Sequence, residues 1–155
     1  NLSVCNHIII RTALLFSEYG NNFLKTMLRL GKEAKELNVV GDQIGCPTYA
    51  PDLASAIICT FDYLNLKKNQ GIYHFAGSPA VSWAGFAAQI FDEMYSANKL
   101  FIKPNVTSIT TDDYPTMAKR PANSRLDSES FEKTFGVKPS NWLIGIRKVI
   151  LQFGG

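Results

Sequence analysis

Short apolar runs alternate with amphipathic stretches along the whole 155-residue chain, and this alternation limits the folds open to it. Residues 7–16 are almost continuously apolar or β-branched, which predicts one strand buried on both faces. Residues 37–40, 72–76 and 106–110 predict three further short strands. Because helical patterns separate these runs, the sequence predicts a single α/β unit.

Capping signals bound the helical stretches. Asn22 can cap a helix reaching about residue 35, Pro51 suits the first turn of a second, and Ser82 can cap a third reaching about residue 95. Two more helices are predicted from 128 to 135 and from 140 to 153. The core-facing side of the second helix is predicted from spacings of three and four residues: Leu53, Ile57, Phe61 and Leu64.

Composition excludes several classes of protein. Hydrophobic residues make up 46% and charged residues 19%, which favours a sizeable core over disorder. A net charge of +3 predicts no nucleic-acid partner, and the apolar runs are too short to span a membrane. Cys5, Cys46 and Cys59 form no metal-binding or disulfide pattern, so we expect buried, reduced thiols and no metal site. The apolar start without Met favours a piece of a longer protein.

Polar groups in three places suggest chemistry, each with a plain structural alternative. Arg11 and Thr12 interrupt an apolar strand, where they can face a ligand or form a salt bridge. Residues 41–48 (GDQIGCPT) offer the neutral groups of Gln43 and Thr48, as in a sugar site or a simple turn. Arg120 and Arg125 carry forked donors suited to a diphosphate, or they belong to a solvated loop.

Three strings in order carry a family resemblance: NFLKTMLRL at 22–30, DQIGCPT at 42–48, and YPT at 114–116 followed by RPANSRLD at 120–127. They resemble the dTDP-4-dehydrorhamnose reductases, which are extended short-chain dehydrogenases/reductases. The resemblance implies an α/β fold: the C-terminal, substrate-binding half of an NAD(P)-binding Rossmann-type reductase, with the N-terminal dinucleotide-binding half absent. Residues 1–155 would form a single substrate-binding domain, in which residues 6–16 resemble a late strand of the Rossmann sheet.

The resemblance also implies a reaction. The reaction is the reduction of dTDP-4-dehydro-β-L-rhamnose to dTDP-L-rhamnose by NADPH or NADH. It belongs to the biosynthesis of cell-surface polysaccharides, and the resemblance implies a cytoplasmic enzyme. It further implies a homo-oligomer and allows Mg²⁺. The catalytic Tyr and Lys and the Gly-rich cofactor turn are expected upstream of Asn1, since no two glycines here are spaced two or three apart. The strings Tyr63–Lys67 and Tyr95–Lys99 are assigned no catalytic role, so we expect the chain alone to be inactive and to bind no cofactor. Because the strand over residues 8–16 would lose its neighbours on one side, we also expect the chain to self-associate or to be only marginally stable.

Site residues follow from the resemblance and from the chemistry of the side chains. Arg11 and Thr12 are predicted on the cofactor side. Leu14 replaces a Trp that contacts the sugar in family members, which puts that contact in doubt. Two alternatives stay open: another nucleotide-sugar reductase, epimerase or dehydratase, and a non-catalytic regulatory subunit such as the β subunit of methionine adenosyltransferase. The predicted substrate-binding residues are Thr12, Arg29, Gln43, Pro47, Thr48, Arg120, Asn123 and Arg125.

Overall fold

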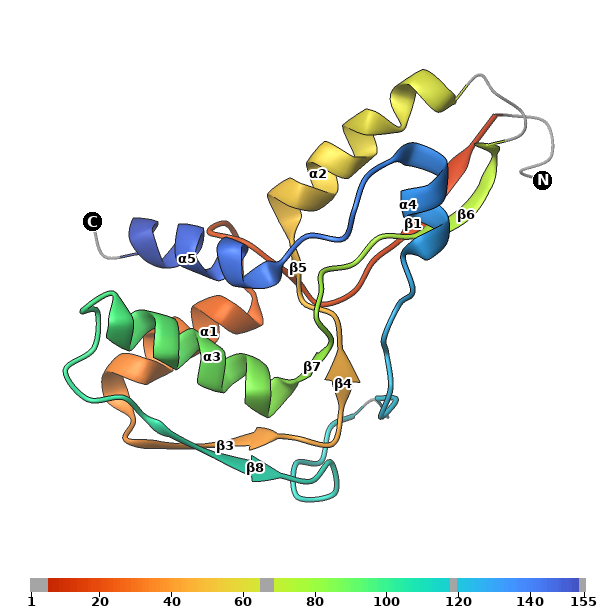
Figure 1. Ribbon diagram of the computed structural model, residues 1–155. Helices are drawn as coiled ribbons and strands as arrows, with labels where there is room; N and C mark the ends of the chain where they lie inside the picture. Colours follow the sequence, from red (N-terminus) through yellow and green to blue (C-terminus); the bar gives the residue numbers. More distant parts are fainter. Residues whose placement is uncertain (1–5, 65–68, 118–119, 154–155) are drawn as a thin grey trace.

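The computed structural model describes residues 6–64, 69–117 and 120–153, and the chain forms two lobes (Figure 1). The large lobe contains α1 (Phe23–Glu33), β3 (Glu36–Val40), α3 (Trp83–Ser96), β8 (Asn105–Ile109) and α5 (Trp142–Gln152). The small lobe contains β1 (Ile8–Arg11), α2 (Ala50–Cys59), the short 3-10 turn η1 (Phe61–Tyr63), β6 (Gly71–His74) and α4 (Glu129–Phe135). Four two-residue strands lie where the lobes meet: β2 (Leu15–Phe16), β4 (Ile44–Gly45), β5 (Thr48–Tyr49) and β7 (Val81–Ser82).

The strands pair in twos, and the parallel pairs confirm the α/β class. β3 pairs in parallel with β8 from Glu36 opposite Asn105 to Val40 opposite Ile109. β1 pairs in parallel with β6, and β2 with β5, whereas β4 and β7 are antiparallel. Because parallel strands need a crossover, each parallel pair joins segments far apart in the sequence.

The large lobe holds the main core. Asn22 caps α1 by accepting a hydrogen bond from the Lys25 N–H at 3.0 Å, and Ser82 caps α3 in the same way through the Gly85 N–H at 3.1 Å, as the sequence predicted. The helices α1 and α3 approach closely at Gly31, where an added Cβ would lie 2.8 Å from the Phe91 ring. Phe86, 1% exposed, packs its ring against Phe16, Phe23 and Trp142.

The small lobe has a separate and smaller core. Phe131 and Phe135 of α4 pack against Tyr73 and Phe75, with ring centroids between 4.8 and 6.2 Å apart. From α2, Ala56 is the residue buried in this cluster. Burial on this lobe is therefore confined to one side of the β1–β6 ribbon.

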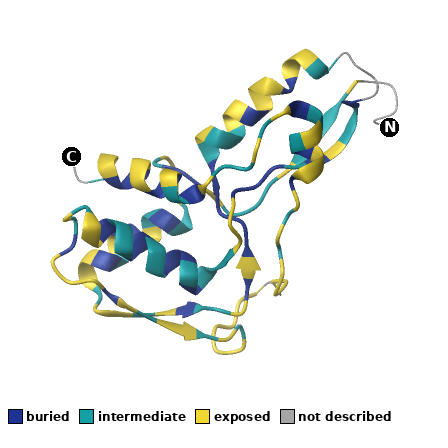
Figure 2. Ribbon diagram, viewed as in Figure 1, coloured by how far each residue is buried: buried dark blue, intermediate teal, exposed yellow. Residues whose placement is uncertain are grey.

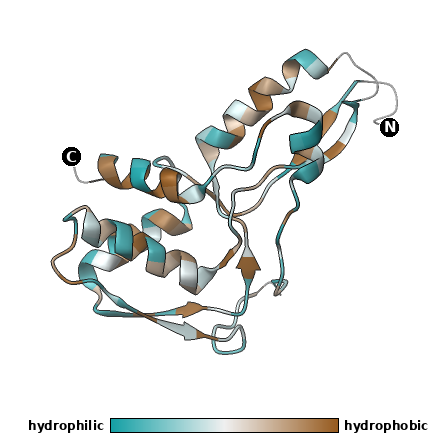
Figure 3. Cartoon of the chain, in the orientation of Figure 1, coloured by the Kyte–Doolittle hydropathy of each residue, from teal (hydrophilic) through white to brown (hydrophobic). Residues whose placement is uncertain are grey.

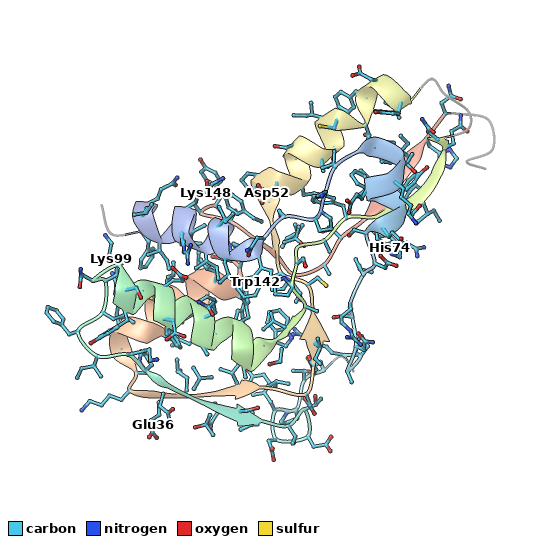
Figure 4. All side chains as sticks on the ribbon, viewed as in Figure 1. Glu36, Asp52, His74, Lys99, Trp142 and Lys148 are labelled. Atoms are coloured by element: carbon cyan, nitrogen blue, oxygen red, sulfur yellow. The ribbon has the colours of Figure 1, made fainter. Side chains whose placement is uncertain are left out.

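Polar contacts hold the two lobes together. The Thr48 hydroxyl accepts a hydrogen bond from the Gly77 N–H at 3.0 Å, and an added Cβ at Gly77 would overlap the Pro47 carbonyl oxygen. The indole N–H of Trp142, labelled in Figure 4, donates to the Pro79 carbonyl at 2.6 Å. Glycine is required at position 77 because two backbones meet there.

The predicted strand over residues 7–16 is wrong in its length and burial. The structure has two strands, interrupted at residues 12–14, where Leu14 adopts a left-handed backbone with φ of 47°. β1 joins the small lobe and β2 joins β5, so the break redirects the chain. Ile8, Ile9 and Ile10 are only half-buried, since no described helix or strand covers the outer face of their ribbon.

The predicted core face of α2 is wrong at Ile57 and Phe61 and confirmed at Leu53, which packs against the small core. Ile57 is 39% exposed and Phe61, beyond the end of α2, is 58% exposed, while Leu53 and Leu64 are partly buried. Figure 2 shows α2 mostly in the colour of exposed residues, and Figure 3 shows apolar residues along the same helix. The helix contacts its small core through Ala56 and Leu53, which leaves Ile57 and Ile58 outside.

Smaller differences concern the loops and thiols. Residues 41–48, interpreted as a loop, contain β4 and part of β5. Cys46 is buried as expected, but Cys59 is exposed, and Cys5 lies outside the described residues. No helix within the described ranges is long and apolar enough to cross a membrane.

Candidate substrate site

A cavity of about 300 Å³ opens in the large lobe between α1, β3 and the segment that follows β8. Its size falls at the lower end of the range typical of small-molecule sites. Apolar side chains form most of its wall and polar groups lie at one side. The lining residues are Phe23, Thr26, Met27, Leu30, Leu37, Asn38, Val39, Val40, Gln43, Trp83, Tyr114, Thr116 and Arg120.

Two aromatic residues form part of the apolar wall. Phe23 is the first residue of α1 and Trp83 the first residue of α3, each placed by its N-cap. Their ring centroids are 4.7 Å apart at an interplanar angle of 53°. Met27 and Leu30 extend the wall along α1. Flat and apolar surfaces of this kind suit a planar ring of a ligand.

A hydrogen-bond network borders the polar side of the cavity just beyond β3 and β8. The backbone N–H and the hydroxyl of Thr111 donate to the two carboxylate oxygens of Asp42, at 2.9 and 2.7 Å. The Gln43 amide nitrogen donates to the Thr111 hydroxyl oxygen at 3.0 Å. The backbone bond from Thr111, followed by its side-chain bond, lowers the pKa of Asp42, so the carboxylate is ionised at neutral pH.

The segment after β8 supplies the remaining polar groups. Asp113 accepts hydrogen bonds from the backbone N–H and the hydroxyl of Thr110, and these bonds lower the pKa of Asp113. This turn leads to Tyr114, 59% exposed, and to Thr116 and Arg120 at the cavity. Arg120 is the one charged residue among the described lining residues, and no ion pair within the described ranges involves it.

The structure brings together some of the residues that the sequence singled out. Gln43 and Arg120 both line the cavity. Asn123 forms a bridge beside Ile44, and its side-chain oxygen accepts a hydrogen bond from Arg125 Nε at 2.9 Å. Arg29 lies on the outer surface of α1 with Glu33 3.5 Å away. The binding roles of Asn123, Arg125 and Arg29 stay predictions.

The other predicted residues lie at the junction of the lobes. Pro47 and Thr48 are fully buried there, and the Thr48 hydroxyl is engaged with the Gly77 N–H and the Cys46 carbonyl. Neither residue lines the cavity. The backbone of Thr48 is held by β2. Their place favours a structural role, and a contact with substrate stays a prediction.

Arg11 and Thr12 lie at the carboxyl end of β1. Arg11 is exposed, opposite His74 in the strand register, and His74 is labelled in Figure 4. The Thr12 hydroxyl oxygen is buried and has no hydrogen-bond partner among the described residues. Nucleotides bind outside the carboxyl ends of parallel strands, so an unsatisfied hydroxyl here fits the edge of a cofactor site.

Sequence reasoning missed the aromatic and hydroxyl side of the cavity. Phe23, Tyr114 and Thr116 appeared only in the strings that carry the resemblance, and Trp83 was given no role. The sequence gives only a weak indication that these residues line a cavity, because aromatic residues at the start of a helix more often pack in a core. Among the described residues, no three His, Cys, Asp or Glu side chains gather as metal ligands.

Comparison with known proteins places this geometry in a family. The model of the RmlD substrate-binding domain matches residues 1–154. The chain belongs to this family. The dTDP-4-dehydrorhamnose reductase of Aggregatibacter actinomycetemcomitans is 50% identical over 144 residues, which are 92% of this chain and 49% of that protein. This RmlD-type chain thus spans about half the length of the curated relatives it matches.

Solved structures agree with the family and the fold. The dTDP-4-dehydrorhamnose reductase of Clostridium acetobutylicum is 38% identical, with a TM-score of 0.82 over 94% of this chain and 49% of its own. The reductase of Bacillus anthracis, in complex with NADP, is 33% identical, with a TM-score of 0.77 over 94% of this chain and 48% of its own. The RmlD-type chain therefore has the fold expected from the resemblance.

Proposed function

We propose that this chain is the substrate-binding part of an NADPH-dependent reductase that converts dTDP-4-dehydro-β-L-rhamnose to dTDP-L-rhamnose. Family membership and the names of the relatives support the reaction. The observation that carries the proposal is the cavity, because it joins an apolar aromatic wall to a polar side with one arginine. A nucleotide diphosphate sugar has the same division between a planar base and a charged diphosphate.

The side chains divide the work of binding. Phe23 and Trp83 offer ring surfaces for the base, and Gln43 offers its amide. The Arg120 guanidinium can form two parallel hydrogen bonds to diphosphate oxygens. By fixing both ends of the nucleotide, these residues would orient the sugar for reaction without taking part in the chemical step.

The cofactor would meet this chain at β1. NADPH, when bound, supplies the hydride that reduces the C4 ketone. Thr12 fits the cofactor edge because its buried hydroxyl lacks a described partner, and Arg11 lies exposed beside it. We propose that residues outside this chain hold the cofactor diphosphate and donate the proton. We further propose one substrate-binding domain, a homo-oligomeric enzyme and a cytoplasmic location for the whole protein.

A chimera tests the proposed reaction. This chain would be joined to the half of the Aggregatibacter actinomycetemcomitans reductase that it does not match, and NADPH oxidation would be followed with dTDP-4-dehydrorhamnose. We expect turnover by the chimera and none by the 155-residue chain alone. A folded chimera that binds NADPH but reduces no dTDP-sugar would contradict the proposed reaction.

The role of Arg120 is tested in the same chimera. Arg120→Ala removes a charge-assisted contact, so we expect the KM for the dTDP-sugar to rise about tenfold or more, with a smaller change in kcat. Arg147→Ala is the matched control, because Arg147 pairs with Glu93 at 2.8 Å and lines no part of this cavity. An unchanged KM in Arg120→Ala would remove Arg120 from the site.

A further inference from the structure

A short turn follows β8 and carries the cavity residue Tyr114. Asp113 accepts hydrogen bonds from the backbone N–H and the hydroxyl of Thr110, at 3.0 and 2.7 Å, and its own N–H donates to the Thr110 carbonyl at 3.2 Å. The Tyr114 N–H donates to the Thr111 carbonyl, also at 3.2 Å. All these bonds are local, so Tyr114 belongs to a compact turn that is closed on itself.

Asp42 holds this turn through Thr111. Both of its carboxylate oxygens are used, one by the Thr111 N–H at 2.9 Å and the other by the Thr111 hydroxyl at 2.7 Å. The pairing of β3 with β8 does not depend on these bonds, because it extends over five residues and is continued by the bond from the Gly41 N–H to the Ile109 carbonyl at 2.9 Å. The Asp42 carboxylate therefore acts on the turn beyond the strands.

Tyr114 depends on such support more than the other aromatic residues of the cavity do. Phe23 and Trp83 each begin a capped helix, and their rings pack against each other. Tyr114 is 59% exposed and lies in no helix or strand. Asp42 is itself exposed and is not among the described residues that line the cavity. Any effect of Asp42 on a ligand there would have to pass through another residue.

We propose that Asp42 is a positioning residue for the nucleotide sugar: by binding Thr111 it holds Tyr114 at the cavity, where the tyrosine contacts the substrate. The inference rests on the proposed function, to which it adds a substrate-contacting residue and the acidic residue that places it. A binding group held in place before the ligand arrives loses less conformational freedom on binding. Removing Asp42 therefore weakens binding even though Asp42 touches no ligand.

Kinetics of the chimera with the other reductase half test this route. Tyr114→Ala and Asp42→Ala should each raise the KM for the dTDP-sugar about three- to tenfold, with a smaller change in kcat. The double variant should have the KM of Tyr114→Ala alone, because Asp42 acts through Tyr114. A merely structural role for Asp42 would give two losses that multiply, and that result would overturn the inference.

A conservative variant and a local measurement guard against a general loss of folding. Asp42→Asn keeps the shape and one acceptor oxygen, so it should recover part of the affinity that Asp42→Ala loses. In the 155-residue chain, amide exchange followed by NMR should be faster at Thr111 and Tyr114 in Asp42→Ala, while β3 and β8 stay protected. Loss of protection along both strands would show that Asp42 supports the fold, and the inference would fail.

Asp92→Ala is the matched control, because Asp92 is a surface carboxylate that pairs with Lys103 at 2.7 Å and is not among the described lining residues. It should leave the KM unchanged. If the unaltered chimera reduces the dTDP-sugar and Tyr114→Ala has the same KM, the inference fails and the proposed function stands. If the unaltered chimera binds NADPH and reduces no dTDP-sugar, the proposed function fails and the inference with it.

Discussion

The two lobes are built from the same kinds of elements but differ in how fully those elements are covered. In the large lobe, α1 and α3 pack together over β3 and β8, and one continuous core includes α5. In the small lobe, α2 and α4 contribute to a core that includes five buried residues in the described part of the chain, and Ile57, Ile58, Phe61 and Ile72 stay exposed.

This difference teaches where binding and association are built into the fold. A cavity that must hold polar groups within fractions of an ångström needs rigid surroundings, which the large lobe provides. An exposed cluster of apolar side chains is typical of a surface that contacts another protein. We therefore predict ligand recognition in the large lobe and association at the small one.

Truncating the centre of the small core should produce the largest effect. Phe131 is fully buried and packs against Tyr73, Phe75 and Phe135. Phe131→Ala should cost about 3–5 kcal/mol of stability and speed amide exchange in β6 and α4 while α1 and α3 stay protected. Hydrogen exchange followed by mass spectrometry measures this. Equal loss of protection in both lobes would show that they unfold as one unit.

Alkaline pH should lower the stability of the main core, which includes Tyr49. Tyr49 is 3% exposed, and burial, with a hydrogen bond to Glu18 at 3.1 Å, raises its pKa to about 12. The folded state holds this proton more tightly than the unfolded state, so the contribution is complete below pH 10 and is lost as pH rises to about 12. It amounts to about 2–3 kcal/mol.

Thermal unfolding at pH 9 and at pH 11.5 would measure the Tyr49 contribution. The upper pH lies about half a pH unit below the pKa of Tyr49 in the folded state, so most of the loss occurs between the two measurements. Tyr49→Phe is the control, because it removes the ionising group while keeping the ring against Phe16. A pH dependence that is identical in Tyr49→Phe would assign the alkaline loss to other groups.

Substitution at the junction should have a smaller effect. Gly77→Ala would push its methyl group into the Pro47 carbonyl oxygen, which cannot move freely because both segments are held by Thr48. We expect a loss of about 1–3 kcal/mol, measured by urea unfolding. Gly85→Ala is the comparison, since its methyl group would meet side chains alone, the tip of Val81 closely and the Ser82 hydroxyl at ordinary contact distance. A smaller loss at Gly77 than at Gly85 would contradict this account.

Surface changes on the small lobe should alter association and hardly alter stability. Ile58 and Phe61 are 63% and 58% exposed, so replacing both by Lys should change the free energy of unfolding by about 0.5 kcal/mol or less. We expect the self-association of the chain, measured by sedimentation velocity, to fall. Leu151→Lys on α5, 75% exposed, is the control. If the unaltered chain sediments as a monomer, the prediction that the small lobe mediates self-association is wrong.

Sequence patterns predicted the large lobe better than the small one, and the reason is physical. Asn22 and Ser82 act locally, because a cap needs only a side-chain oxygen and a nearby N–H, and both helices begin where predicted. The spacing of Leu53, Ile57 and Phe61 is equally regular, yet periodicity reports an apolar face and not whether anything covers it.

The candidate site was predicted in part for a similar reason. Gln43 and Arg120 were singled out by side-chain chemistry and both line the cavity. Thr48 was chosen on the same grounds, but its hydroxyl serves the Gly77 N–H, a partner 29 positions away. The link from Asp42 to Thr111 spans 69 positions and could not be read from local spacing.

The left-handed backbone of Leu14 determines how the two lobes are connected. It splits one apolar run so that the first part is bonded to β6 and the second to β5. Thr48, the first residue of β5, accepts a hydrogen bond through its hydroxyl from the N–H of Gly77, which lies just past β6. Strand pairing and the bond from the Gly77 N–H to the Thr48 hydroxyl thus connect the lobes at more than one place. We therefore expect a displacement of β1 to shift β5 as well.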